Sequence, residues 1–226
     1  MSKSQNDAQS ACGGPPPAEG LEVVSKEEIK EILKKVDKEA SARKLTGIPR
    51  WIVYLIGVSW SIFQVYTAAF GLFPAQLQRS IHLAYAFVLT FLLFPARSGR
   101  SSNRLSWHNW VLVLFAGYIG SYMALNYIRI MEAGGDYSRM DYIAAGCGIL
   151  LTLEAARRVV GLPIVCLASF FIVYTYFGPY FPGFMAHRGY SLERIASHMY
   201  LTTEGILGIP LGVAATFIYL FILFGS

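Results

Sequence analysis

Three charged residues, Glu154, Arg157 and Arg158, directly follow a stretch of uncharged residues, 142–153. On a helix, spacings of three and four residues place these side chains near one face, where the carboxylate can pair with both guanidinium groups. A carboxylate among apolar groups is costly unless it is paired, whereas arginines near a helix end reach lipid headgroups and suit the negative end of the helix dipole. Two interpretations follow: a positively charged membrane anchor with a local ion pair, or a contact with a partner domain or a lipid headgroup.

The other reactive side chains form no recognisable catalytic or metal-binding pattern. The four histidines fall in different segments, none with a second ligand three or four residues away, and the three cysteines include no CxxC pair. The sequence also contains no Gly-rich phosphate loop, nucleophile elbow or paired carboxylates. We therefore expect no enzyme, no catalytic residues, no bound metal and no cofactor. The one enzymatic alternative is a site on the outer face built from His187, His198 and Glu193.

The elements that carry these residues are predicted to be membrane-spanning helices. Hydrophobic residues make up 54% of the 226 residues and charged residues only 15%, which is far more apolar than a soluble domain. A helix needs about 20 apolar residues to cross the hydrocarbon core, and an open sheet would leave backbone groups unpaired in lipid. The sequence thus predicts an all-α polytopic membrane protein with about six transmembrane helices, at 51–73, 80–94, 107–128, 142–160, 163–180 and 206–224.

The first 45 residues have a different character. Residues 1–24 are small and polar and lack the apolar stretch of a signal peptide, which predicts a disordered tail. Residues 25–45 are predicted to form an amphipathic helix, because Ser25 and Glu28 have the spacing of a capping box and apolar residues recur at helical intervals. This helix either lies in solvent or binds an anionic membrane surface through its lysines.

Basic residues set the expected orientation. Nine lysines and arginines precede residue 51, and five arginines lie in the connections after the second and fourth apolar stretches. Positively charged connections stay in the cytoplasm, so the N-terminus is expected there. Because the net charge of +5 comes largely from lysines next to the membrane, lipid is the expected partner and nucleic acid is not.

The last apolar stretch begins with the sequence "EGILGIPLG", which contains Gly205, Gly208, Pro210 and Gly212. Entry into the bilayer through a segment interrupted by glycine and proline is a feature of transporters, whose unwound backbone can line a cavity. Small residues four positions apart, here and at 144–148, let helices approach closely in a membrane. We interpret these residues as packing and assembly positions.

Two polar residues lie within apolar stretches. Gln64 belongs to the first stretch and His82 to the second. We expect both to make hydrogen bonds between helices rather than to bind a ligand.

Three segments, "LEAARRVVGLP", "GPYFPGFMAHRGYSLERIASHMY" and "TTEGILGIPLGVAATFIYLFILFG", closely resemble the fused permeases of TRAP (tripartite ATP-independent periplasmic) transporters, in their TAXI branch. The likeness is strongest from Asp141 to the end. In that family a four-helix small domain is fused to a larger domain, an extracytoplasmic binding protein delivers an organic acid, and a sodium gradient drives uptake. The resemblance therefore implies a multi-pass protein of the bacterial or archaeal cytoplasmic (inner) membrane.

Mapped onto this chain, the resemblance implies a small membrane domain at 46–161 and the start of the large permease domain at 162–226. A fused permease would continue beyond residue 226, so the resemblance implies a truncated or split permease. Its partners would be the remaining large permease domain or subunit, the substrate-binding protein and membrane lipid. The sodium ion belongs to the complete transporter only, and the substrate-binding residues stay unknown.

Two alternatives remain open for the function. One is a membrane-anchored scaffold or interaction protein that acts through the cytoplasmic helix at 25–45. The other is a non-functional permease remnant. Under the permease interpretation, Glu154, Arg157 and Arg158 help to seat the small domain at the cytoplasmic face.

Overall fold

A computed structural model describes residue 43, residues 45–96 and residues 107–225. The chain divides into two compact units, Met1–Asp37 and Lys38–Ser226, and all described residues belong to the second. The predicted tail at 1–24 lies outside the described residues, as does the predicted helix at 25–45 apart from residues 43 and 45. Both predicted membrane domains, 46–161 and 162–226, fall within the second unit, and the boundary between them stays a prediction.

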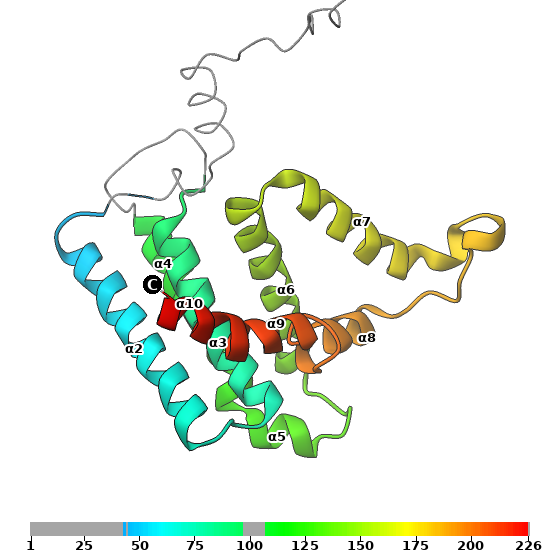
Figure 1. Cartoon of the computed structure of the whole chain (residues 1–226). Coiled ribbons are helices and arrows are strands. Elements are labelled where there is room, and N and C mark those ends of the chain that lie inside the picture. Colours follow the sequence, from blue (N-terminus) through cyan, green and yellow to red (C-terminus); the bar gives the residue numbers. More distant parts are fainter. Residues whose placement is uncertain (1–42, 44, 97–106, 226) are drawn as a thin grey trace, which may run out of the picture. The chain divides into compact units, whose positions relative to one another are not determined.

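The described residues are all-helical and include no strand, as predicted (Figure 1). The first helices are α2 (Ile48–Phe70), α3 (Ala75–Leu93), α4 (Trp107–Leu125), α5 (Tyr127–Glu132), α6 (Arg139–Val159) and α7 (Leu162–Phe177). Two short 3-10 turns follow, η2 (Gly178–Tyr180) and η3 (Gly183–Met185). The chain ends with α8 (Leu192–Ala196), its π-helical continuation η4 (Ser197–Leu201), and a last helix built from α9 (Ile209–Val213), η5 (Ala214–Ile218) and α10 (Tyr219–Gly225). Each apolar stretch predicted from the sequence overlaps these helices, although 107–128 runs from α4 into α5 and 206–224 begins in the turns before α9.

Helix ends follow from local sequence. Gly71 ends α2 with a positive φ of 114°, which glycine adopts without steric cost, and its N–H donates to the Thr67 carbonyl. Ser138 begins α6 as one half of a capping box with Asp141. Gly161, with φ 117°, separates α6 from α7, and Pro163 stands in the first turn of α7, where its missing N–H costs nothing. These local signals divide the largely apolar region 142–177 into two helices, α6 and α7.

The core lies between α3, α4 and α6, with η4 packed on α6. The α3 and α4 backbones approach closely at Gly120, where an added Cβ would stand 2.7 Å from the Ala84 Cα. Such close approach lets long stretches of the two helices pack against each other. The core side chains are Leu83, Phe87, Phe91 and Leu92 from α3, Val113, Ala116, Ile119, Tyr122 and Met123 from α4, Ile130 from α5, Ala144, Ala145, Ile149 and Leu151 from α6, and Tyr200, Leu201 and Leu207.

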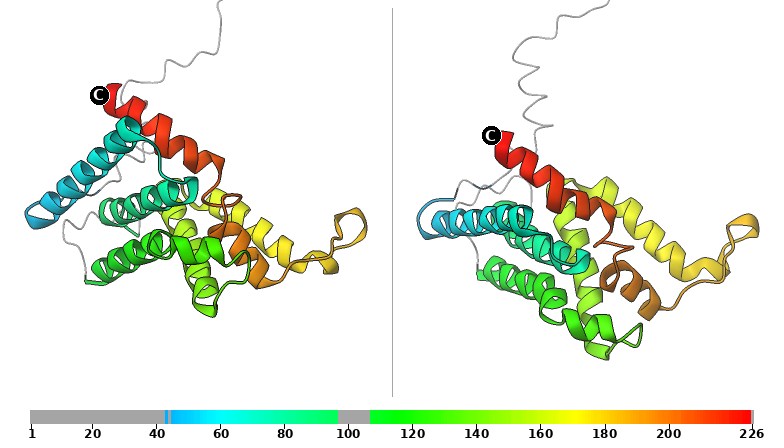
Figure 2. Two further views of the ribbon diagram at one scale, coloured as in Figure 1. Left: turned by 90° about the horizontal axis from the view of Figure 1, so that it is seen from below. Right: turned by 60° about the horizontal axis from the view of Figure 1, so that its bottom comes forward.

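The C-terminal helix lies against α2 and α3, which come from the other end of the described chain (Figure 2). The Tyr219 hydroxyl lies 3.0 Å from the Ser61 hydroxyl, and the Tyr219 ring lies 4.7 Å from the Trp60 ring. Residues of the predicted large domain thus pack directly on residues of the predicted small domain. This packing joins the two segments within one compact unit.

The hydrogen bonds expected of Gln64 and His82 are present. Gln64 Nε2 lies 2.7 Å from His82 Nδ1, which links α2 to α3, and both residues are buried. The buried Gln78 side chain adds bonds to Gln64 and Thr67. Because polar groups in an apolar interior are costly unless they are paired, these bonds fix how α2 and α3 face each other.

Two helices of the described residues are long and apolar enough to cross a membrane, Ile48–Phe70 and Leu162–Tyr180. The apolar segments Asn109–Leu125 and Ile209–Gly225 are shorter, and α6 carries at least three charged residues in every 18-residue stretch. Six crossings are therefore a finer prediction than the described helices support. The coarser prediction, an all-helical chain with helices suited to a membrane, holds.

Candidate functional site

The ion pair expected at the end of α6 is present. Glu154 Oε2 accepts a hydrogen bond of 2.7 Å from Arg157 Nε, and Glu154 Oε1 accepts bonds of 2.8 Å from Arg157 Nη2 and Arg158 Nε. The three side chains thus share one face of the helix, as their spacing predicts. The carboxylate is 29% exposed, so these bonds replace much of its hydration.

The two arginines also bind the end of α3, which sequence spacing does not reveal. Arg158 Nη1 donates to the Phe94 carbonyl at 3.2 Å, and Arg157 Nη2 donates to the Ala96 carbonyl at 3.0 Å. The Arg158 guanidinium stacks over the Phe91 ring at 4.8 Å, and its side chain is only 3% exposed. The Arg158 side chain is therefore held against the end of α3. Two positive charges at the C-terminus of α3 complement its helix dipole.

Replacing Glu154 tests this arrangement. We expect Glu154→Ala to lower the free energy of unfolding by about 1 kcal/mol, because both arginines lose their carboxylate. Glu154→Gln should cost less, since the amide oxygen still accepts from the arginines. Thermal unfolding of both variants in detergent measures the difference, and equal losses would contradict a paired role for Glu154.

The glycine- and proline-rich segment breaks the helical path where the sequence predicts a break. Turns join η4 to α9, and Pro210 stands in the first turn of α9. Within the turns, Ile206 N–H donates to the Met199 carbonyl at 2.7 Å, and Gly208 N–H donates to the Gly205 carbonyl at 2.9 Å. A Cβ on Gly205 would collide with the Met199 backbone, so only glycine fits there without a shift. The broken segment has a defined conformation held by its own backbone.

Side chains from the start of α3 hold this broken segment. Gln76 Nε2 donates to the Leu201 carbonyl, and Arg79 Nη1 donates to the Leu207 carbonyl at 2.8 Å. Gly212 leaves room for the guanidinium, because a Cβ there would stand 2.7 Å from Arg79 Nε. Carbonyls freed by the helix break are thus satisfied by a distant helix.

Arg79→Gln is expected to loosen the broken segment. The shorter amide loses the bond to the Leu207 carbonyl, which stabilises the fold by about 1 kcal/mol. Amide hydrogen exchange at 202–208 should therefore become faster, by roughly fivefold for a loss of that size. Arg50→Gln removes the same charge from an exposed position of α2 and is the matched control. Unchanged exchange in Arg79→Gln would show that the backbone turns alone hold the segment.

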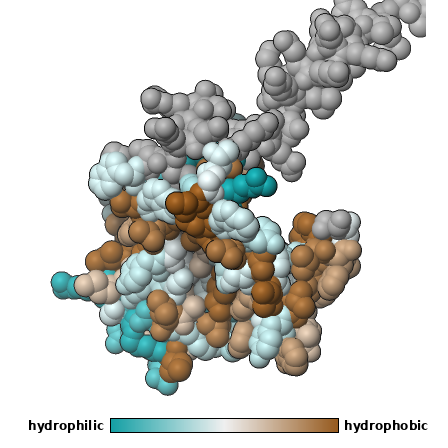
Figure 3. Space-filling view, turned by 90° about the vertical axis from the view of Figure 1, so that its left-hand side faces the viewer, coloured by the Kyte–Doolittle hydropathy of each residue, from teal (hydrophilic) through white to brown (hydrophobic). Residues whose placement is uncertain are grey.

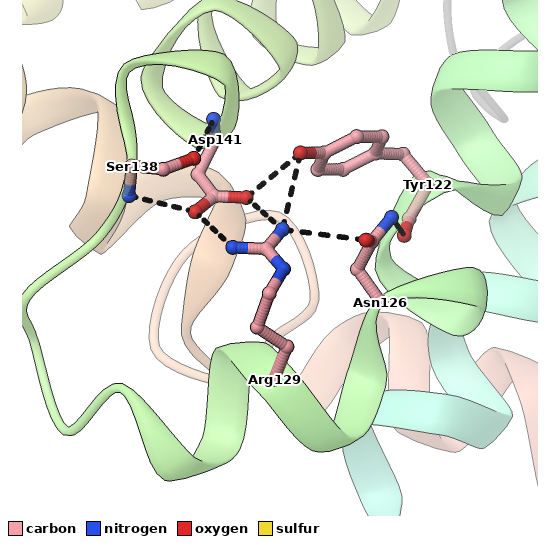
Figure 4. A network of polar contacts seen from close by, with 5 residues as sticks. All are labelled: Tyr122, Asn126, Arg129, Ser138 and Asp141. Atoms are coloured by element: carbon pink, nitrogen blue, oxygen red, sulfur yellow. Dashed lines mark hydrogen bonds and ion pairs between the residues drawn. The ribbon is translucent and has the colours of Figure 1, made fainter.

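A second polar cluster surrounds Asp141, at the start of α6 (Figure 4). Arg129 Nη1 donates to Asp141 Oδ2 at 2.8 Å and its Nη2 to Oδ1 at 2.6 Å, a bidentate pair. Tyr122 OH donates to Oδ1 at 2.8 Å, and the Ser138 N–H donates to Oδ2 at 2.8 Å. Arg129 Nη2 also lies 3.3 Å from Asn126 Oδ1. Asp141 is fully buried, so each of these donors replaces water.

These bonds, the one from Arg129 first, hold the pKa of Asp141 well below its ordinary value despite burial. The carboxylate therefore stays charged at neutral pH and ties α4, α5 and α6 together. The charge pattern and the apolar stretches of the sequence do not predict this cluster. The signal that could have found the cluster is the Ser138/Asp141 capping-box spacing, which marks the start of a helix.

The histidines of the enzymatic alternative have separate partners. His187 Nε2 lies 3.1 Å from the Tyr174 carbonyl, while His198 Nδ1 lies 3.1 Å from Glu204 Oε2. No group of three histidine, cysteine, aspartate or glutamate residues in the described ranges is placed to hold a metal ion. The structure thus gives no single site that contains both histidines.

A cavity of about 760 Å³ lies beside α7 and α8. Its walls include Phe171 and Ile172 of α7, Ile195 of α8 and Met199 of η4, with Arg194 among the polar lining residues. This volume falls within the range of small-molecule pockets. The Arg194 guanidinium, however, stacks over the Tyr190 ring at 5.5 Å and is exposed, so no buried polar group marks a ligand position there.

Comparisons of the sequence with models of protein families, with curated proteins and with solved structures find no match to any of them.

Proposed function

We propose that this chain is an integral membrane protein, and the observation that carries the proposal is the exposure of α2 and α7. Both helices are long and apolar, yet only 11% and 6% of their most apolar stretches is buried within the protein. Core helices of soluble proteins bury such residues, and exposed apolar surface of this extent marks a membrane or a protein interface.

The apolar residues lie all around α7 and along α2. None of the α7 residues is buried, and Leu162, Phe170 and Phe171 are each more than half exposed. On α2, Trp51, Tyr54 and Ile62 are exposed in the same way. Figure 3 shows apolar residues spread over the face seen from the α2 side. Lipid tails would cover both helices without further protein contacts.

Within the membrane, we propose a component of a secondary, sodium-coupled TRAP-type permease for organic acids. The support comes from the resemblance of its segments and from the broken helix at 202–208, because interrupted helices held by distant side chains are typical of transporters. Its proposed partners are the remaining permease helices and an extracytoplasmic binding protein. The proposed location is a bacterial or archaeal cytoplasmic membrane, with several crossings and the N-terminus inside.

Membrane insertion and orientation are tested by fractionation and cysteine labelling. The expressed chain should stay in the membrane fraction through an alkaline wash and need detergent for extraction. In a background without the native cysteines, a cysteine at position 157 should react with an impermeant maleimide only after the cells are opened. Labelling of position 157 in intact cells would show that the orientation is opposite to the proposed one. A chain that is soluble without detergent would contradict the membrane proposal.

The permease proposal is tested by purification with partners. A tagged chain should recover a polypeptide that carries the remaining permease helices, and the pair should accumulate an organic acid in vesicles only when a sodium gradient is imposed. An inserted chain that recruits no such polypeptide would contradict the permease proposal and leave the membrane proposal intact.

A further inference from the structure

The end of α3 gathers arginines from two distant parts of the chain. Arg43 donates its backbone N–H to the Leu93 carbonyl at 2.8 Å, which places it beside the carbonyls of Phe94 and Ala96 that Arg158 and Arg157 bind. We call Arg43, Arg157, Arg158 and Glu154 the arginine cluster. Three positive charges and one negative charge give the cluster a net charge of +2.

The arginine cluster has donors that its own carboxylate does not satisfy. On each of Arg157 and Arg158, Nε and one terminal nitrogen donate to Glu154 or to the carbonyls of Phe94 and Ala96. Arg43 Nη1 is buried and has no hydrogen-bond partner among the described residues. A buried charged donor without an acceptor is costly, so an anion beside Arg43 would stabilise the site.

The environment of Arg43 would favour an anion. Burial, and after it the positive charge of Arg158, lowers the pKa of Arg43 from its ordinary value. Neighbouring guanidinium groups are an arrangement that binds a phosphate, whose oxygens accept several N–H groups at once. A monoanion would neutralise half of the net charge of the cluster, and a dianion would neutralise all of it.

We propose that the arginine cluster binds a phosphate group, supplied by the headgroup of an anionic phospholipid. The choice of a lipid rests on the proposed membrane location, since Arg157 and Arg158 end a helix whose preceding residues, 142–153, are uncharged. Clusters of arginines at this position meet the anionic headgroups of the cytoplasmic leaflet. Free phosphate has the same chemistry and is the other source to be distinguished.

The test uses the full chain purified in detergent and two lipids with identical tails, phosphatidylglycerol and phosphatidylcholine. Native mass spectrometry should show that phosphatidylglycerol binds about tenfold more tightly than phosphatidylcholine. Phosphatidylglycerol carries a net negative charge that complements the positive cluster, whereas phosphatidylcholine has no net charge. Arg43→Gln and Arg157→Gln should each lower the affinity for phosphatidylglycerol by about tenfold, the effect of losing one charge-assisted hydrogen bond. Arg188→Gln removes the same charge from an exposed loop and should leave the affinity unchanged.

Inorganic phosphate distinguishes the sources. Phosphatidylglycerol binding that phosphate does not displace identifies the lipid headgroup, whereas equal stabilisation by phosphate alone identifies free phosphate, and both results support the cluster as a phosphate site. Equal affinity of the wild type for the two lipids, or the same affinity in Arg43→Gln as in Arg188→Gln, would overturn it. Thermal unfolding without lipid checks that each variant is folded. If Arg43→Gln does not fold, Arg43→Lys takes its place, because lysine keeps the charge but lacks the planar pair of donors.

The outcomes for this site and for the proposed function are separate. If the chain inserts into membranes but shows no preference for phosphatidylglycerol, only the proposed phosphate site is contradicted. A chain that remains in solution loses the membrane proposal, and its binding of inorganic phosphate then still tests the cluster.

Discussion

Asp141→Ala should lower the free energy of unfolding by about 3 kcal/mol. The substitution removes the Asp141 half of the α6 capping box, the bond from the Ser138 N–H, which contributes about 1 kcal/mol. It also leaves the Tyr122 hydroxyl without its acceptor, which costs about 2 kcal/mol more. Denaturant unfolding in detergent micelles measures the loss. Asp141→Asn should lose less, because its carbonyl oxygen still accepts one of the donors.

Asp136→Ala is the matched control for Asp141→Ala. The Asp136→Ala substitution removes the same charge five residues earlier in the chain, at a side chain that is exposed. Substitution of an exposed residue of this kind should change stability by less than about 0.5 kcal/mol. If the two alanine variants are equally stable, the cluster around Asp141 does not stabilise the fold.

Stability should also depend on pH through Asp141. Its pKa is lower in the folded protein than the ordinary value of 3.8, so the unfolded chain takes up a proton first as the pH falls. The stabilisation is therefore complete above about pH 5 and is lost progressively as the pH falls below about 4 toward the folded pKa. The wild type should lose more stability than Asp141→Asn between pH 5 and 3, and parallel curves would contradict this assignment.

The sequence predicts the helices well because their signals are local. Apolar stretches, Gly161 and Pro163 are enough to separate α6 from α7, and the spacing of Glu154, Arg157 and Arg158 is enough to predict their ion pair. The predicted start of the fourth helix, at 142, is three residues late because the capping box was not recognised. An apolar pattern alone does not contain the polar first turn of a helix.

Contacts between distant segments could not be predicted in this way. Arg158 lies 64 residues from the carbonyl of Phe94 that it binds, and Arg79 lies 128 residues from the carbonyl of Leu207. Nothing in the sequence near either arginine specifies these acceptors, since helix packing brings them together. The number of membrane crossings could not be predicted either. Apolar composition predicts a helix but does not say whether protein or lipid covers that helix.

Gly148 provides the second large expected effect, because it faces the ring of Tyr200. Tyr200 is completely buried, and its hydroxyl donates to the Ile119 carbonyl at 2.8 Å, which joins η4 to α4 across α6. A Cβ on Gly148 would collide with three atoms of this ring. The ring is buried and its hydroxyl is held by the Ile119 carbonyl, so Gly148→Ala is expected to move η4 or to break this bond.

We expect Gly148→Ala to lower the free energy of unfolding by about 2 kcal/mol, the usual cost of overpacking a core. Gly146→Ala is the control on the same helix, because no atom lies within 4 Å of its added Cβ, and it should stabilise α6 by up to about 1 kcal/mol through helix propensity. Unfolding of both variants in detergent therefore should give changes of opposite sign. In a Tyr200→Leu background the collision is absent, so Gly148→Ala should no longer destabilise the protein, and an unchanged loss there would show that the Tyr200 ring is not its cause.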